Sequence, residues 1–354
     1  MGVDPAFWRG KRVLLTGHTG FKGSWLALWL QRLEADVLGY SISVPTTPSL
    51  YEDAEVGASM VSIEGDVRDP KRLGDALREH CPEIVIHMAA QALVLRSLGD
   101  PVETYETNVL GTVYLLEAVR HTPDVRVVVN VTSDKCYENR EWPWPYRESE
   151  PMGGRDPYSS SKGCSELVTS AYRASFFSSE SGTRVASARA GNVIGGGDWA
   201  GDRLVPDLMR GALRGEVVRI RNPSAVRPWQ HVLNPLNGYL QLAQRLWDEP
   251  SYADAWNFGP GDDSARSVEW VVERLTELWG DGLRTQADPG SGGREALSLR
   301  VDSSKARASL GWSPVWDLDD GLRATVDWYK AYEAKRGLRE VVDDQIASFE
   351  RSLA

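Results

Sequence analysis

Tyr158 and Lys162 stand four residues apart in the segment DPYSSSKGCSELV (156–168), which has the pattern of a helix start. On a helix, this spacing places both side chains on one face. A phenol has a pKa of about 10, and a neighbouring ammonium group lowers it. The pair could therefore take a proton from an alcohol as a general base. An exposed pair on a helix surface has the same spacing, so this interpretation depends on the rest of the chain.

Three further reactive side chains follow one another in TSDKCYENREW (132–142). Ser133 supplies a hydroxyl group, Asp134 a carboxyl group and Lys135 an ammonium group. They come after VRVVVNVT (125–132), a β-branched run typical of a buried strand. The hydroxyl could hydrogen-bond a reacting alcohol, while the two charged groups could give and take protons. Two solvated loop charges are the alternative.

A glycine-rich turn, TGHTGFKG (16–23), separates the apolar run RVLLT (12–16) from the helical pattern SWLALWLQRL (24–33). Glycines between a strand and a helix allow a tight turn and the close approach of a pyrophosphate to the helix N-terminus. The turn therefore predicts a dinucleotide site, although a plain strand–helix turn is the alternative. The expected contacts come from Gly17, Thr19, Gly20, Phe21, Lys22 and Gly23.

The segment GYSISVP (39–45) stands where an acidic residue for the ribose of NAD is expected. It holds serines but no carboxylate, and no arginine for the 2′-phosphate of NADP. We therefore expect NAD, bound more loosely than usual. In GDVRD (65–69), Asp66 could accept a hydrogen bond from the adenine amino group and Val67 could pack on the ring. A solvated turn is the alternative.

Strand-like and helical patterns alternate along the first part of the chain, which predicts an α/β fold with a doubly wound parallel Rossmann sheet. We expect the NAD-binding domain over 1–190, rejoined by about 232–260, and a smaller, interleaved mixed α/β substrate-binding lobe over 191–231 and 261–354. Strands are expected at 12–16, 36–42, 83–90, 125–132, 183–191 and 252–260, and helices at 24–33, 102–121, 158–179, 234–247, 267–280, 303–311 and 318–336.

Composition excludes several classes of protein. With 50 acidic and 40 basic residues among 354, the formal charge of −10 argues against a nucleic-acid binder with a broad basic surface. No apolar run approaches the roughly 18 residues of a membrane span, and the N-terminus does not have the pattern of a secretory signal. Cys81, Cys136 and Cys164 lack metal-binding spacing. We therefore expect a cytoplasmic protein without a metal site.

The glycine turn, Ser133 and the pair of Tyr158 and Lys162 together resemble the short-chain dehydrogenase/reductase family, and the length of the chain indicates its extended, nucleotide-sugar branch. The resemblance covers nearly the whole chain and is strongest to the CDP-glucose 4,6-dehydratases, a group of NAD-dependent nucleotide-sugar dehydratases. The most specific segments are GHTGFKGSWL (17–26), SDKCYEN (133–139) and GNVIGGGDW (191–199).

The chain departs from the family pattern in two places. Many nucleotide-sugar 4,6-dehydratases have Asp–Glu where this chain has Asp134 and Lys135. In REALSLRVD (294–302), Arg294 replaces a histidine and Ser298 replaces an aromatic residue. The second departure could alter the rim of the substrate site.

The resemblance implies the removal of water from CDP-glucose, which gives CDP-4-dehydro-6-deoxyglucose, with NAD recycled within each turnover. Ser133 would hold the reacting 4-hydroxyl group, and Tyr158 with Lys162 would remove its proton. Lys135 would then remove the C5 proton, and Asp134 would protonate the departing 6-hydroxyl group. These roles are what the family pattern implies for the matching positions.

The resemblance also implies binding residues and an assembly. Helices 102–121 and 158–179 would form the interface of a homodimer or a dimer of dimers. Arg219 and Arg221 are either further phosphate ligands or surface charges. Additional cofactor contacts are expected from Ala89, Ala90 and Asn108, and substrate contacts from Gln91, Arg96, Asn192, Arg203 and Arg227.

Three alternatives remain open at the level of sequence. The first is a nucleotide-sugar 4-epimerase, against which Asp134 and Lys135 argue, because epimerisation releases no water. The second is a 4,6-dehydratase that acts on another nucleoside diphosphate glucose. The third is a dinucleotide-sensing binding protein, a class that characteristically loses the tyrosine or the lysine that this chain keeps at 158 and 162.

Overall fold

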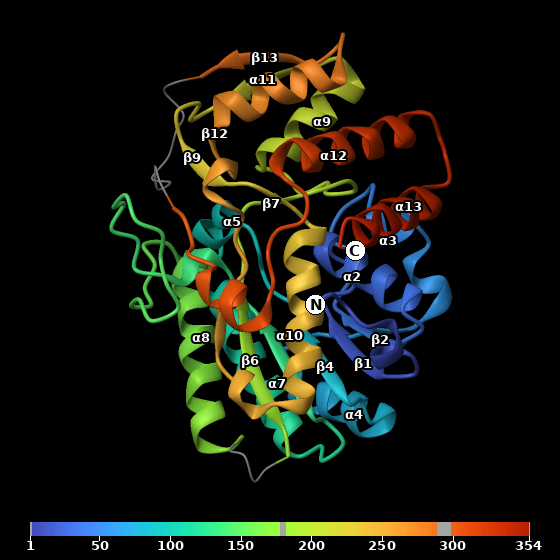
Figure 1. The fold of residues 1–354 in the computed structure, drawn as a ribbon, viewed down its shortest axis with the longest axis vertical. Coiled ribbons are helices and arrows are strands. Elements are labelled where there is room, and N and C mark those ends of the chain that lie inside the picture. Colours follow the sequence, from blue (N-terminus) through green and yellow to red (C-terminus); the bar gives the residue numbers. More distant parts are fainter. Residues whose placement is uncertain (1, 178–181, 289–298, 354) are drawn as a thin grey trace.

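The computed structural model describes residues 2–177, 182–288 and 299–353. Its central strands are β1 (Arg12–Thr16), β2 (Asp36–Ser41), β3 (Val61–Glu64), β4 (Ile84–His87), β5 (Val127–Val131), β6 (Arg184–Arg189) and β11 (Ala255–Asn257). They form one parallel sheet in the order β11–β6–β5–β4–β1–β2–β3 (Figure 1). The strand order reverses between β1 and β4, and ligands bind outside the carboxyl ends of strands at such a point. The predicted doubly wound sheet is confirmed.

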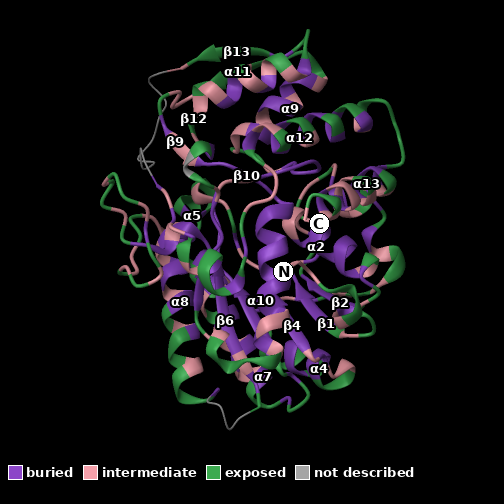
Figure 2. Cartoon of the chain, in the orientation of Figure 1, coloured by how far each residue is buried: buried purple, intermediate pink, exposed green. Residues whose placement is uncertain are grey.

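Apolar cores lie on both faces of the sheet, because alternate residues of a strand point to opposite faces. In β1, Leu14 belongs to one core, while Val13 and Leu15 belong to the other. Most residues of the strands are accordingly buried, whereas the edge strand β3 is mainly exposed (Figure 2). The helices α4 (Pro70–His80), α7 (Gly111–Arg120) and α8 (Pro157–Ser175) contribute to the first core, and α2 (Phe21–Arg32) and α10 (Leu233–Asp248) to the second.

The helix expected at 102–121 is divided into three parts. It consists of α6 (Pro101–Tyr105), the π-helical turn η2 (Glu106–Leu110) and α7. Turns of this kind are rare and often occur beside functional sites. The η2 turn carries Asn108, which is buried and hydrogen-bonded to Gln91 in the loop that follows β4. A periodic apolar pattern does not reveal such a turn.

A second lobe lies over one end of the sheet (Figure 1). Its elements are α9 (Leu204–Arg214), β8 (Val217–Ile220), β9 (Val226–Pro228), β12 (Ala265–Ser267), α11 (Val268–Trp279), β13 (Arg284–Ala287) and α12 (Leu318–Glu333). Strand β8 pairs with β13, and β9 pairs with β12. Between these segments the chain returns to the sheet, where β11 pairs with β6. The lobe and the sheet therefore alternate along the chain.

Several other elements were not expected from the sequence or differ from expectation. The helix expected at 303–311 is mainly the π-helical turn η6 (Ala306–Leu310). Helix α13 (Leu338–Arg351) was not expected, and its Phe349 packs edge to face on Trp29 of α2. The remaining short elements are α1 (Pro5–Trp8), α3 (Leu50–Asp53), η1 (Val56–Ser59), α5 (Val94–Gly99), η3 (Asp134–Cys136), β7 (Val193–Ile194), β10 (Gln230–His231), η4 (Pro250–Tyr252) and η5 (Asp262–Ser264).

Three buried histidines should make the stability of the fold sensitive to acid. Burial lowers the pKa of His18 to about 4 and the pKa values of His87 and His231 to about 3. Since histidine in an unfolded chain titrates near a pKa of about 6.5, the unfolded state binds more protons between these values. The free energy of unfolding should therefore fall as the pH drops below about 6.5, by about 2.5 kcal/mol per histidine at about pH 4.5.

Urea denaturation at about pH 7 and about pH 4.5 measures this loss. His231→Phe should reduce the pH dependence by about a third, because it removes one of the three groups. The ring of His231 packs between Trp25 and Trp316, where a phenyl ring fits. The same pH dependence in wild type and variant would contradict the explanation.

No helix among the described residues is long and apolar enough to cross a lipid bilayer.

Candidate active site

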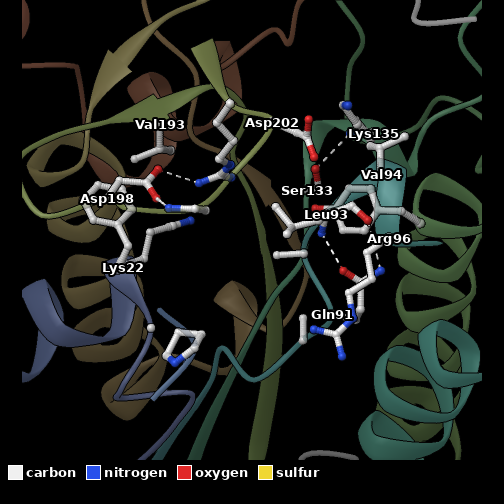
Figure 3. A pocket seen from close by; sticks show the side chains of 18 of the residues that line it. Lys22, Gln91, Leu93, Val94, Arg96, Ser133, Lys135, Val193, Asp198 and Asp202 are labelled. Atoms are coloured by element: carbon white, nitrogen blue, oxygen red, sulfur yellow. Dashed lines mark hydrogen bonds and ion pairs between the residues drawn. The ribbon is translucent and has the colours of Figure 1, made fainter. Parts of the chain in front are cut away.

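A large cavity lies between the carboxyl ends of the sheet strands and the second lobe, and its volume is about 1770 Å³. Pockets for one small ligand have volumes of roughly 300–1,000 Å³, so this cavity has room for a dinucleotide together with a second molecule of nucleotide size. Figure 3 shows Lys22 and Asp198 on one side and Ser133, Lys135 and Arg96 on the other.

Two of the three glycines allow the backbone of the glycine turn to pack tightly. Gly17 has a φ of 77°, which favours glycine, and a Cβ there would lie 2.8 Å from the backbone nitrogen of Ala89. A Cβ on Gly23 would lie closer than 3.0 Å to the carbonyl oxygen of Gly17. Both glycines are therefore needed for the turn itself.

Gly20 differs from them, because the turn leaves room for a side chain at this position. A Cβ there would meet only the carbonyl oxygen of Gly17, at 3.4 Å. Gly20 also begins α2 without a side-chain cap, so the first N–H groups of α2 are available to an anion. The turn thus forms a cradle that fits the pyrophosphate of a dinucleotide, and a side chain at position 20 would fill it.

Gly20→Val should therefore weaken NAD binding by at least about tenfold, with little change in thermal stability. Isothermal titration and thermal denaturation measure the two effects. Gly261→Val is a matched control, since Gly261 lies outside the cavity and a Cβ there would meet no atom within 4 Å. Unchanged NAD affinity in Gly20→Val would mean that the pyrophosphate does not lie on this turn.

Serines stand at the end of β2, where an acidic residue for the ribose is expected, and Thr19 is hydrogen-bonded to them. The Thr19 backbone N–H donates to Ser41 Oγ at 3.4 Å, and Thr19 Oγ1 donates to the Ser43 carbonyl at 2.6 Å. Asp66 and Val67 line the cavity nearby. The Asp66 carboxylate is paired with Arg68 at 2.7 Å. An adenine amino group that donated to Asp66 would therefore share this carboxylate with the guanidinium group of Arg68.

The start of α8 places Tyr158 and Lys162 at the cavity. Asp156 caps the helix by accepting the Ser159 N–H at 2.9 Å, and the proline at the first helical position fits this start. Tyr158 and Lys162 both line the cavity one turn apart. The Tyr158 N–H donates to Ser97 Oγ at 3.2 Å, and Lys162 Nζ donates to the Val131 carbonyl at 3.5 Å.

Burial governs the protonation of this pair. It lowers the pKa of Lys162 to about 8, against the opposing effect of Glu166. It raises the pKa of the Tyr158 phenol, while a hydrogen bond with Ser133 and the charge of Arg203 act in the opposite direction. The phenol therefore needs further positive charge beside it before it can act as a base at neutral pH.

The loop after β5 brings Ser133, Asp134 and Lys135 to the same cavity. Ser133 Oγ donates to Asp134 Oδ1 at 3.0 Å and accepts the Lys135 N–H at 3.2 Å. Asp134 is only 1% exposed, and its Oδ2 has no hydrogen-bond partner among the described residues. Burial raises the pKa of Asp134, although Lys135 and Ser133 oppose this. A carboxyl group of this kind can deliver a proton.

The cavity is locally cationic, although the chain carries a net charge of −10. Lys22 Nζ donates to Tyr239 Oη at 3.0 Å, and burial, with Lys162 and Arg203 nearby, lowers the pKa of Lys22 to about 7. Arg203 is paired with Asp198 at 2.8 Å. Further arginines line the same cavity, among them Arg219, Arg221 and Arg227. Guanidinium groups suit the geometry of phosphate.

The cavity brings together all but one of the predicted site residues. Its lining includes Gly17, Thr19, Gly20, Phe21, Lys22, Gly23, Asp66, Val67, Ala89, Ala90, Gln91, Arg96, Ser133, Asp134, Lys135, Tyr158, Lys162, Asn192, Arg203 and Arg227.

Asn108 is the exception, because it lies beneath the cavity wall and not in it. Its Oδ1 accepts the Gln91 N–H at 2.8 Å, and its Nδ2 donates to the Gln91 carbonyl at 3.0 Å and to Ser161 Oγ at 2.8 Å. In the structure, Asn108 positions the loop that lines the cavity. Direct contact with the cofactor remains a prediction for Asn108.

Two predicted substrate ligands have partners within the protein. The Gln91 carboxamide donates to Thr104 Oγ1 at 2.9 Å and accepts the Leu93 N–H at 2.7 Å, which fixes the local turn. Arg96 is paired with Glu103 at 2.7 Å, and its side chain is 58% exposed. Contact with the substrate remains a prediction for both.

Sequence reasoning missed a buried ion pair behind the site. Glu166 Oε2 accepts from Arg189 Nη2 at 2.8 Å, and both side chains are 4% exposed. Glu166 also accepts hydrogen bonds from Thr132 and Ser187. Glu166 stands one turn after Lys162 on α8, and this position was the only signal in the sequence.

Arg294 and Ser298 lie outside the described residues. Within residues 2–177, 182–288 and 299–353, no group of three or more His, Cys, Asp or Glu side chains is arranged to hold a metal ion.

Comparison with known proteins shows the family of the chain. Residues 13–259 match the NAD dependent epimerase/dehydratase family. The chain is 54% identical to the CDP-glucose 4,6-dehydratase of Salmonella typhimurium over 90% of both chains. It is 28% identical to a dTDP-glucose 4,6-dehydratase of Xanthomonas campestris, over 88% of this chain and 91% of the relative.

Among solved structures, the dTDP-glucose 4,6-dehydratase DesIV of Streptomyces venezuelae with NAD bound superposes with a TM-score of 0.77 at 25% identity, over 93% of this chain and 99% of that chain. Fold, site and similarity agree with the family expected from the sequence. The chain belongs to the NAD dependent epimerase/dehydratase family.

Proposed function

We propose that the protein is a CDP-glucose 4,6-dehydratase, a hydro-lyase that converts CDP-glucose to CDP-4-dehydro-6-deoxyglucose and water. The observation that carries the proposal is the meeting of Tyr158 and Lys162 with Asp134 and Lys135 in one cationic cavity. An oxidation at C4 needs only the first pair. The second pair supplies the acid and the base that an elimination requires.

Each residue has a separate task in the proposed reaction. Tyr158 accepts the proton of the 4-hydroxyl group, with Ser133 hydrogen-bonded beside it and Lys162 stabilising the phenolate. When bound, NAD supplies a hydride acceptor for C4 and a hydride donor for C6. Lys135 takes the proton from C5, which the 4-ketone has made acidic. Asp134 gives a proton to the 6-hydroxyl group as the C6–O bond breaks, and a proton returns to C5 at the end.

The diphosphate of the substrate is assigned to Arg203 and Arg227, with Asn192 beside them. CDP is favoured as the nucleotide by the 54% identity to the Salmonella typhimurium enzyme, in contrast to 28% for the relative that acts on dTDP-glucose.

The purified protein with NAD and either CDP-, dTDP-, UDP- or GDP-glucose tests the proposal by mass spectrometry of the products. Loss of one water from CDP-glucose, without accumulation of NADH, is the expected result. Loss of water from another nucleotide sugar instead would overturn the assignment of CDP-glucose as the substrate, while the assignment of the reaction as a dehydration would stand. An unchanged mass with conversion to the galactose configuration would identify a 4-epimerase.

Lys135→Ala should prevent exchange of the C5 proton with solvent, while oxidation at C4 remains measurable. The reason is that Lys135 and Tyr158 act on different carbons. Nuclear magnetic resonance in deuterium oxide detects the exchange. Dehydration at the wild-type rate in this variant would remove Lys135 as the base.

The assembly and the compartment are also proposals. A homodimer, or a dimer of dimers, would cover the exposed apolar side chains Val102, Leu110 and Leu167 on the helices at 101–120 and 157–175. Light scattering measures the mass of the assembly.

The three free cysteines favour the cytoplasm as the compartment of the protein.

A further inference from the structure

Asp134 lies against a backbone corner that follows β6, and Gly191 forms this corner. A Cβ built on Gly191 would come closer than 3.0 Å to all three atoms of the Asp134 carboxyl group. Side chains do not tolerate such distances, so the carboxyl group occupies the space that a side chain at position 191 would take. Its position depends on the absence of a side chain there.

The corner itself is held in a fixed conformation. Asn192, the next residue, has a φ of 43°, a left-handed conformation that is costly for a residue other than glycine. The Gln230 N–H donates to the Asn192 carbonyl at 3.3 Å, and the Gln230 side chain donates to the Phe258 carbonyl at 2.8 Å. Gln230 is 1% exposed. Strain held by a buried partner is typical of a functional site.

A hydrogen bond from the neighbouring residue holds the carboxyl group on its other side. Asp134 Oδ1 accepts from Ser133 Oγ at 3.0 Å, whereas Oδ2 has no partner among the described residues. Oδ2 is also the atom nearest to the missing Cβ of Gly191. Contact with the Gly191 backbone therefore determines where the atom that has no protein partner lies.

We propose that Gly191 is a positioning residue for the elimination step, because it gives the Asp134 carboxyl group the space from which Asp134 protonates the departing 6-hydroxyl group. The proposal rests on the proposed function for the identity of that step. It assigns no chemistry to Gly191 itself, which acts only through Asp134.

Gly191→Ala should displace the carboxyl group, which can rotate away because it is the end of a flexible side chain. A misplacement of about 1 Å can lower a rate on the order of 10²-fold. Dehydration should therefore fall about 10²-fold in kcat, while NADH formation in a single turnover, which reports oxidation at C4, stays within about threefold of wild type. Gly261→Ala is the control, since its surroundings are open.

A double-mutant cycle distinguishes this role from a general packing role. If Gly191 acts through Asp134, then Gly191→Ala lowers kcat and the melting temperature in the wild-type background but neither in the Asp134→Ala background. Equal losses in the two backgrounds, loss of C4 oxidation in Gly191→Ala, or wild-type dehydration in Gly191→Ala would each overturn the proposal.

The melting temperatures measured in the cycle remain informative if a variant is unstable. Recovery of a poorly folded Gly191→Ala protein by Asp134→Ala would support the proposal, since removing the carboxyl group removes the clash. Failure of the double variant to fold would overturn it. If the wild-type protein released no water from any nucleotide sugar, the proposed function would fail, and the melting temperatures would still show whether Gly191 positions Asp134.

Discussion

Replacing Tyr158 by phenylalanine should lower turnover by on the order of 10³-fold, with no NADH formed in a single turnover. Tyr158 is the phenol beside Lys162 in the cavity, and the variant lacks the group that we propose takes the proton of the 4-hydroxyl group. All later steps need the ketone, so C5 exchange and loss of water should disappear together. Single-turnover absorbance of NADH and mass spectrometry of the product measure the two losses.

Tyr172→Phe is the matched control, since Tyr172 stands on the same helix and its hydroxyl group donates to Glu117 at 3.5 Å, outside the cavity. It should keep wild-type turnover. Dehydration by Tyr158→Phe at a rate near that of wild type would exclude Tyr158 as the base. NADH formation without dehydration would instead place Tyr158 in the elimination step.

Replacing Arg189 by methionine should destabilise the fold by about 3–5 kcal/mol, because it leaves the buried carboxylate of Glu166 without its counter-charge. Burial opposes ionisation of Glu166, and the charge and hydrogen bond of Arg189 nevertheless keep the pKa of Glu166 below its ordinary value. Arg189 also donates to Tyr137 Oη at 2.7 Å. Chemical denaturation at neutral pH measures the loss.

Two variants control for this effect. Arg9→Ala breaks an ion pair whose side chains are 64% and 63% exposed, and it should not change stability measurably. Arg189→Met combined with Glu166→Gln should recover part of the lost stability, since no buried charge remains unpaired. A loss in the double variant equal to the sum of the single losses would show that the two residues stabilise the fold independently.

Local patterns in the sequence predicted the sheet and the reacting groups. The glycine turn at 16–23 fixes a strand and a helix within eight residues, and Tyr158 and Lys162 need only a helix to share a face. These features depend only on residues that are close together in the sequence, so the local sequence pattern is sufficient to predict them.

Contacts between distant segments could not be predicted in this way. Glu166 and Arg189 are 23 residues apart, and Asp134 meets Gly191 only because β5 and β6 are adjacent in the sheet. Asn108 was expected at the cofactor only through the resemblance to the family. Its partners proved to be Gln91 and Ser161, which a π-helical turn brings within reach.

Transfer of deuterium within the substrate tests the central claim most directly. The protein is incubated with NAD and CDP-glucose that carries deuterium at C4, and the product is examined by nuclear magnetic resonance. If oxidation, elimination and reduction occur in one cavity with one cofactor molecule, the deuterium is recovered at C6 and no NADH is released. Deuterium that remains at C4, or that appears in free NADH, would contradict the account.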